Sequence, residues 1–282
     1  MANTVDKSFE QQWSAEVKQA YQQRTQKLRD CVRTQTGVVG SQFSFPKLGS
    51  ISATTKARNA ELTAQSADHN VATATLEDAY ASLYIDKLDN VKNSADYRKE
   101  YVQTVAYALA RKADDIVIAA LDAGVSAGSP LPEGALTEVA GGTGTVFESI
   151  LTAARNLNNA DVPMEDRVFL HAPGTLDKAL RETEFTSADF QMIKALVQGA
   201  IDSALGFRWK MSTRLSNNVG SPNFKQNYAF AKSSIGLAIG ADITTELNYI
   251  PQRVSHLAAS YLSMGSTIIE GGGIVRVNID ES

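Results

Sequence analysis

Histidine and cysteine are the side chains that most often bind a metal or act as nucleophiles, and this chain has three histidines and one cysteine. His69, His171 and His256 are far apart in the sequence, and no HExxH or CxxC spacing typical of a zinc site is present. Cys31 lies in a helical pattern, where a lone cysteine is most often a small packing residue. We therefore expect no metal site, and we predict structural or solvent-facing roles for the histidines.

A glycine-rich stretch, Gly141–Thr145 (GGTGT), precedes a helical pattern and resembles a phosphate-binding loop. It lacks the GK[ST] ending of such loops, and Pro130 and Pro132 lie where a buried strand would have to precede it. No GxSxG motif is present, and the adjacent acids Asp114–Asp115 and Glu165–Asp166 are expected on solvated faces. A nucleotide-binding enzyme that uses this loop remains an alternative. The favoured interpretation is a protein with no catalytic residue and no cofactor.

The composition is that of an ordinary globular protein, with 282 residues, of which 43% are hydrophobic and 21% charged. The formal net charge is −4 and no basic block occurs, so the charge pattern gives no indication of a nucleic-acid-binding face. A single cysteine excludes a disulfide within the chain and favours a reducing compartment during assembly. No secretory signal and no apolar run of about 20 residues, the length that spans a membrane, is visible.

The longest helical signal in the chain is Ser94–Gly124, in which apolar residues recur every three to four positions. Ser94 is a suitable N-cap, and Gly124 is suited to the position just after the helix end. At about 1.5 Å per residue the helix would be roughly 45 Å long. A helix of this length is expected to serve as a spine on which other elements pack.

The N-terminal region, Asp6–Arg33, is predicted to be a helix with a narrow apolar stripe that includes Phe9, Trp13 and Val17. The stripe could pack on its own domain. Alternatively, the helix is an arm that docks on a neighbouring subunit, because so narrow a stripe is hard to stabilise alone. We take these three residues as candidates for a subunit interface.

Two stretches rich in β-forming residues, Gly37–Leu48 and Val71–Ile85, enclose a polar segment, Gly49–Asn70. The first is expected to end at Pro46. The simplest interpretation is a long two-stranded arm, which is marginally stable in isolation and needs something outside the chain to complete it. The charged residues of the connecting segment that we take as interface candidates are Lys56, Arg58 and Glu61.

The rest of the chain alternates helical and strand patterns and predicts an α+β fold. Helices are expected at Thr145–Asn158, Thr175–Glu182 and Phe190–Gly199, and strands at Arg167–His171 and Gly206–Thr213. The Gly/Pro-rich stretch Val125–Gly144 is predicted to be a connector, and Tyr228–Ile239 is a buried strand or helix. Thr267–Ile269 and Ile274–Ile279, separated by three glycines, are predicted to pair as a closing hairpin.

Leu151–Leu180 contains a helical pattern followed by Leu-Asn, Val-Pro, Arg, a short apolar strand and Pro. This run resembles one found in the major capsid proteins of tailed bacteriophages. The residues that carry this pattern are Leu157, Asn158, Val162, Pro163, Arg167 and Pro173. Leu205–Leu215 is similar to their Gly-Phe-x-Val-x-x-Ser strand, with Trp209 where valine is commoner, and the C-terminal residues resemble their closing hairpin.

This resemblance implies the Hong Kong 97 capsid fold. The chain would have an N-terminal arm (1–36), an extended β-hairpin loop called the E-loop (37–89), and a peripheral domain with the spine helix and a sheet (90–124 and 242–282). An axial domain (125–241) would complete it. The implied protein is structural and not an enzyme. It would self-assemble as hexamers and pentamers into an icosahedral shell that encloses the phage double-stranded DNA genome.

The resemblance also implies partners and a location. These are other copies of the chain, a portal, a possible decoration protein, and packaged DNA held without sequence-specific contact. No long charged segment precedes Asp6, so we expect a separate scaffolding protein, and we expect noncovalent assembly because no crosslinking residue can be assigned. The protein would be assembled in the host cytoplasm, would reside in the virion capsid, and would have no membrane association. An encapsulin-like shell around cargo and a tail or fibre component remain alternatives.

Overall fold

The computed structural model describes residues 19–61, 64–87, 98–126, 137–139, 145–182, 203–218 and 221–281. Helices and strands are mixed along the chain, as the predicted α+β class requires. The chain divides into two compact units. The first comprises Met1–Thr25, Asp78–Lys112 and Ala241–Leu262, and the second comprises Gln26–Glu77, Ala113–Gly240 and Ser263–Ser282.

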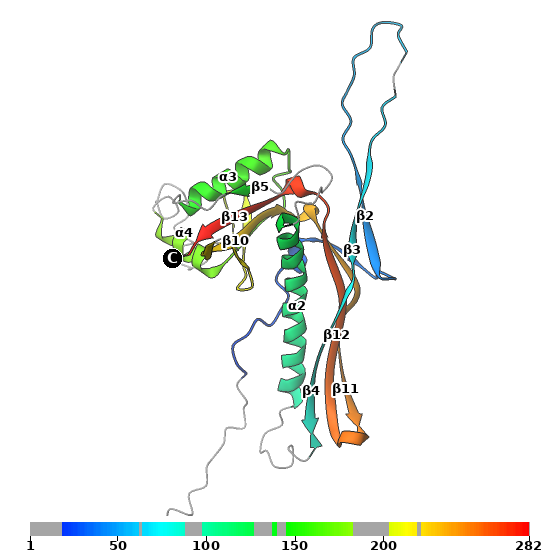
Figure 1. Cartoon of the computed structure of the whole chain (residues 1–282), viewed down its shortest axis with the longest axis vertical. Coiled ribbons are helices and arrows are strands. Elements are labelled where there is room, and N and C mark those ends of the chain that lie inside the picture. Colours follow the sequence, from blue (N-terminus) through cyan, green and yellow to red (C-terminus); the bar gives the residue numbers. More distant parts are fainter. Residues whose placement is uncertain are drawn as a thin grey trace, which may run out of the picture. The chain divides into compact units, whose positions relative to one another are not determined.

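The first unit is built on the N-terminal half of helix α2 (Arg98–Ser126), which lies alongside three long strands (Figure 1). These are β4 (Glu77–Asp86), β11 (Ile235–Ile250) and β12 (Ser255–Ile268), from a sheet with the order β1-β11-β12-β4. Val105 and Leu109 are buried on the helix, one turn apart, as the predicted stripe requires. The predicted spine helix is confirmed from residue 98, whereas Ser94 lies outside the described residues.

The helix does not stop at Gly124, as the sequence suggested, but continues to Ser126. Glycine is tolerated inside a helix at a cost of about 1 kcal/mol, which the packing of a long helix can outweigh. A potential C-terminal glycine is therefore not sufficient to end the helix.

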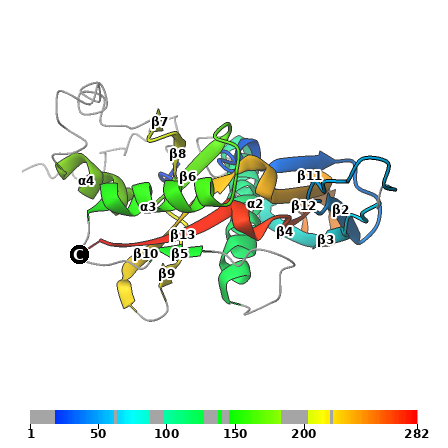
Figure 2. The same cartoon turned by 90° about the horizontal axis from the view of Figure 1, so that it is seen from above.

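The second unit contains a seven-stranded sheet in the order β5-β13-β10-β6-β8-β7, with β9 paired to β10. The strands are β5 (Thr137–Val139), β6 (Arg167–His171), β7 (Ser203–Ala204), β8 (Phe207–Met211), β9 (Asn217–Asn218), β10 (Ser221–Ala231) and β13 (Ile274–Asp280). Helix α3 (Val146–Asn159) runs along β13 (Figure 2), and helix α4 (Pro173–Arg181) packs against α3. Phe169, Phe207 and Trp209 form the aromatic centre of this core.

The predicted helix at 145–158 is present as α3 but begins one residue later, because Thr145 is its cap: the side-chain oxygen of Thr145 accepts the backbone N–H of Glu148 at 3.2 Å. The strand prediction for 206–213 is also confirmed, since Phe207 and Trp209 are buried while Arg208 is exposed. The predicted helix at 175–182 is present but begins earlier, at Pro173, which occupies the first helical position. The predicted helix at 190–199 lies outside the described residues.

The N-terminal region departs from its prediction. From residue 19 onward it is not a helix: it is irregular to Leu28, forms a short 3₁₀ turn η1 (Arg29–Cys31), and ends in strand β1 (Arg33–Thr36). Strand β1 pairs in parallel with β11, Arg33 opposite Gly236. Pairing to a distant strand satisfies the backbone groups that a helix would have satisfied locally, and the apolar periodicity does not reveal this alternative.

The predicted closing hairpin is wrong. Residues 267 and 268 end β12 in the four-stranded sheet, whereas β13 pairs with β10 and β5 in the other sheet. A 3₁₀ turn, η5 (Gly271–Gly273), separates the two strands, and a Cβ at Gly273 would lie 1.9 Å from Ser234 Oγ. The glycines therefore permit close packing where the chain passes from one sheet to the other.

Two further segments differ from, or decide, the sequence interpretation. Strand β5 lies inside the stretch predicted to be a connector, and it pairs in parallel with β13. The ambiguous segment 228–239 is two strands, β10 and β11, separated by the 3₁₀ turn η3 (Lys232–Ser234). A three-residue strand is too short to show a period, and a continuous apolar run does not show where a chain turns.

Strands β2 (Gln42–Leu48) and β3 (His69–Thr75) form a separate antiparallel pair, so the predicted two-stranded arm is confirmed (Figure 1). Pro46 does not end the strand but lies within it, opposite Val71. A two-stranded ribbon has only edge strands, which tolerate a residue without an N–H. Strand β4 follows β3 as a separate element instead of continuing it.

Candidate assembly surfaces

The root of the β2–β3 hairpin is packed tightly against the ends of β11 and β12 in the second unit. Phe45 is 1% exposed, and a Cβ at Gly236 would lie 2.6 Å from its ring. A Cβ at Gly265 would lie 2.1 Å from the Thr75 carbonyl oxygen. The glycines therefore create the space in which the hairpin crosses these strands.

Polar contacts reinforce the root. Lys47 Nζ forms an ion pair with Glu270 at 2.9 Å, and the Lys47 side chain is only 13% exposed. The backbone N–H of Gly49 donates to the Asp68 carbonyl oxygen at 2.7 Å, which extends the pairing one step beyond the strands. The hairpin is consequently fixed up to this point by contacts within its own chain.

Beyond the root, the connecting segment has a different character. Residues 49–61 and 64–68 form neither helix nor strand, and their most defined feature is a turn in which the Ala60 N–H donates to the Ala57 carbonyl at 3.1 Å. Asn59 within this turn has a φ of 68°, a conformation that asparagine tolerates. Ile51 is 64% exposed. The predicted interface residues Lys56, Arg58 and Glu61 are all exposed on this segment.

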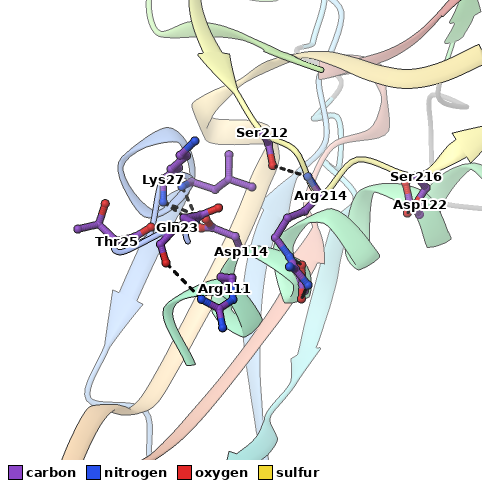
Figure 3. Close-up of polar contacts among 11 residues, drawn as sticks. Gln23, Thr25, Lys27, Arg111, Asp114, Asp122, Ser212, Arg214 and Ser216 are labelled. Carbon is purple, nitrogen blue, oxygen red and sulfur yellow. Dashed lines mark hydrogen bonds and ion pairs between the residues drawn. The ribbon is translucent and has the colours of Figure 1, made fainter. Parts of the chain in front are cut away.

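The other predicted interface residues, Phe9, Trp13 and Val17, lie outside the described residues. The chain that follows them is held by Asp114, which is 2% exposed. Its carboxylate accepts the backbone N–H of Lys27 at 3.0 Å and that of Leu28 at 3.1 Å (Figure 3). The expectation that Asp114 is solvated was therefore wrong: it is buried and compensated by hydrogen bonds to the backbone.

The C-terminal half of α2 has two further acids in structural roles. Asp115 pairs with Arg214, and the hydrogen bond between them raises the pKa of the arginine (Figure 3). Asp122 accepts hydrogen bonds from Ser216 Oγ at 2.7 Å and from the Tyr228 hydroxyl. Neighbouring acids in a sequence do not reveal such remote partners, and sequence reasoning missed this cluster.

The histidines behave as predicted, as structural or solvent-facing residues. His171 is buried beside Phe169 and Trp209, its Nδ1 lies 3.0 Å from the Ala172 carbonyl oxygen, and burial lowers its pKa. His69 is exposed, and His256 lies beside the ring of Tyr249. Within the described part of the chain, no group of three or more His, Cys, Asp or Glu residues could hold a metal ion.

Cys31 lies in the η1 turn and not in a helix as expected. It is buried, and its sulfur lies 3.2 Å from a guanidinium nitrogen of Arg208. These contacts fit the predicted packing role of the side chain.

The end of helix α3 that would bind a phosphate is occupied by the chain itself. Thr145 caps the helix, and the Glu182 carboxylate accepts the N–H groups of Val146 and Phe147, the latter at 3.0 Å. These are the donors that a phosphate would need, and a carboxylate already satisfies them. Residues 141–144 of the glycine-rich stretch lie outside the described residues.

Several solved capsid structures share this fold over nearly the whole chain. A capsid structure of the cyanophage P-SCSP1u superposes with a TM-score of 0.81 at 19% identity, covering 100% of this chain and 96% of the other. A structure from Mycobacterium phage Che8 gives 0.76 at 18% identity, covering 98% of both chains. The capsid asymmetric unit of cyanophage Pam1 gives 0.75 at 12% identity, covering 100% and 99%. No curated protein matches the sequence of this chain.

These likenesses define the fold class as that of phage capsid subunits. A family model described as phage capsid protein matches residues 5–281, so the chain belongs to the phage capsid protein family. It is a structural major capsid protein, a component of the phage virion. None of the described helices has the length and apolarity needed to cross a membrane.

Proposed function

We propose that this capsid protein assembles as hexamers and pentamers that close into an icosahedral shell around double-stranded DNA, and that it has no enzymatic activity. The observation that carries the proposal is the hairpin, whose root is buried in its own chain while its distal segment is exposed. Such a segment gains its contacts when copies of the chain are placed side by side.

The distal segment needs those contacts to become ordered. Fixing each backbone residue costs on the order of 1–2 kcal/mol. Burying one large apolar side chain, such as Ile51, returns only about 1.5–3 kcal/mol. Of the predicted distal part of the E-loop, 47–70, the outer residues 47–48 and 69–70 pair within the root. We propose that the segment between them lies over an adjacent subunit, where strand pairing and charge contacts from Lys56, Arg58 and Glu61 supply the rest.

We further propose that the N-terminal arm, residues 1–36, docks on a neighbour through its first part, with Phe9, Trp13 and Val17 buried between subunits, while its last part is held in its own chain by Asp114 and β11. In the same proposal the E-loop is 37–89, the peripheral domain is 90–124 with 242–282, and the axial domain is 125–241. A separate scaffolding protein, a portal and a possible decoration protein complete the particle. Assembly takes place in the host cytoplasm, is noncovalent, and makes no sequence-specific contact with the packaged DNA.

The arm can be tested with Trp13→Asp. We expect the isolated subunit to remain folded by circular dichroism and its assembly to weaken by sedimentation, because the substitution buries a charge between subunits. A variant that unfolds as a monomer would show that the stripe packs within its own subunit, against the arm proposal.

The shell itself can be tested by expressing the protein with the neighbouring phage genes and following particles by light scattering and electron microscopy. We expect closed shells with five-fold and six-fold clusters. Rods, open rings or monomers under all assembly conditions would contradict the proposal, and nucleotide binding by the free subunit would favour the enzyme alternative.

A further inference from the structure

A cleft with a volume of about 680 Å³ opens between three turns of the second unit. Its walls are the η1–β1 segment, the turn that follows α3, and the η3 turn between β10 and β11. A second hollow of about 510 Å³ shares Arg33, Pro163 and Ser233 with it and reaches Lys47 at the hairpin root. These volumes fall in the range of about 300–1,000 Å³ found for binding pockets.

Hydrogen bonds within the chain fix the walls of the cleft. Arg167 is 5% exposed, and its guanidinium donates to the carbonyl oxygens of Pro163 at 2.9 Å and Val162 at 2.5 Å. The backbone N–H of Lys232 donates to the carbonyl of Asp166 at 3.2 Å, which joins two of the walls. A preformed cleft loses little conformational freedom when it binds a ligand.

The charges around the cleft are balanced. Three basic residues, Arg29, Arg33 and Lys232, are matched by three acids, Asp30, Glu165 and Asp166. A polyanion such as DNA would meet as many repulsive as attractive groups there. Strand β1 is also the terminal strand of its sheet, and an edge strand can pair with an added extended segment. The cleft therefore suits an extended peptide that carries both signs of charge.

The exposed part of the E-loop has these properties. It carries Lys56 and Arg58, followed by Glu61, all exposed, within an irregular stretch without helix or strand. Five residues of extended chain span at most about 18 Å, so both signs can reach one cleft. Within one chain these side chains are exposed and the cleft is open, so its own loop does not fill it.

We propose that the cleft receives residues 49–61 of a second copy of the chain. Lys56 and Arg58 face its acids, and Glu61 faces its basic residues. The inference rests on the proposed placement of the E-loop over an adjacent subunit, and it identifies where on that subunit the loop binds.

The test is a charge exchange between loop and cleft. One variant combines Lys56→Glu with Arg58→Glu in the loop, and a second combines Asp30→Lys with Glu165→Lys in the cleft. All four positions are exposed. Each should raise the subunit concentration needed for assembly by about tenfold or more, because like charges then face one another. The variant with all four substitutions should return to within about threefold of the original protein.

A matched control reverses an acid outside the cleft, Asp177→Lys, whose only ion pair among the described residues is the exposed pair with Arg181. The loop reversal should not rescue this variant. Thermal unfolding of each free subunit separates loss of folding from loss of assembly. If the four-substitution variant assembles no better than either parent, the loop does not bind this cleft and the inference is overturned.

A second measurement separates this inference from the proposed function of the loop. Residues 50–67 are replaced by Asn-Gly, which keeps the Gly49–Asp68 hydrogen bond and the strand pairing of the root. Normal shells from this variant would overturn the intersubunit role of the loop itself. If the deletion variant forms no shells and the four-substitution variant also fails to restore assembly, the loop acts between subunits but does not bind this cleft.

Discussion

The root and the distal segment of the hairpin are adjacent in sequence but are stabilised in different ways. At the root, Phe45 is buried, backbone groups are paired, and glycines permit close approach to β11 and β12. Beyond Gly49 most side chains are polar and exposed. The apolar Ile51 is 64% exposed, whereas Phe45 is 1% exposed. The comparison shows that this subunit anchors the root of the hairpin in its own core. Under our proposal, the distal part is completed by assembly.

The largest expected effect on the free subunit comes from the buried aromatic at the root. Phe45→Ala should lower the free energy of unfolding by about 3–5 kcal/mol, because it leaves a cavity under Gly236. The measurement is denaturant unfolding of free subunits. Its matched control is Ile51→Ala on the distal segment, which should change stability by less than about 0.5 kcal/mol. Similar losses from both variants would remove the distinction between the two regions.

A smaller loss should follow from filling the space at a glycine of the root. Gly265→Ala should destabilise by about 1–3 kcal/mol, since its Cβ would meet the Thr75 carbonyl at 2.1 Å and the backbone would have to shift. Gly272→Ala is the control, because the nearest atom to its Cβ is 3.9 Å away. Thermal melting compares the two, and a tolerated Gly265→Ala would show that the hairpin is not tightly packed there.

The smallest expected effect is a pH dependence that belongs to the sheet core and not to the hairpin. Burial lowers the pKa of His171 below its ordinary value near 6.5. Below about pH 6.5 the unfolded chain therefore binds a proton at His171 more readily than the folded chain does. The contribution of His171 to the free energy of unfolding is fully present above about pH 6.5 and is lost as the pH falls below that value. Unfolding measured from pH 7.5 to 5 should show the loss, and His171→Leu should reduce the slope. An unchanged slope in that variant would assign the pH dependence to other groups.

Much of the fold could be predicted because its signals are local. The stripe of α2, the cap at Thr145, and the alternation of Phe207, Arg208 and Trp209 each lie within one element. The resemblance of residues 151–180 and 205–215 to phage capsid proteins pointed to the family that the whole chain matches. The elements whose signals are local were therefore readable from the sequence alone.

The wrong predictions share a physical cause: the segments concerned form hydrogen bonds with residues that are distant in the sequence. The segment that follows residue 19 does not form a helix: Lys27 and Leu28 donate their backbone N–H groups to Asp114, and strand β1 pairs with β11. The closing strands separate into two sheets because β13 pairs with β10 and β5. For the surfaces, exposure of Lys56, Arg58 and Glu61 could be expected from their charge, but the cleft could not, because three remote turns form it.

Hydrogen exchange across the hairpin, compared between free subunits and assembled shells, tests the central claim most directly. In the paired strands 42–48 and 69–75, the N–H groups that face the partner strand should exchange slowly in both states, because they are already bonded within the chain. Residues 49–61 should exchange fast in free subunits and become protected in shells. Equal protection of residues 49–61 in the two states would contradict the account, because assembly would then add nothing to this segment.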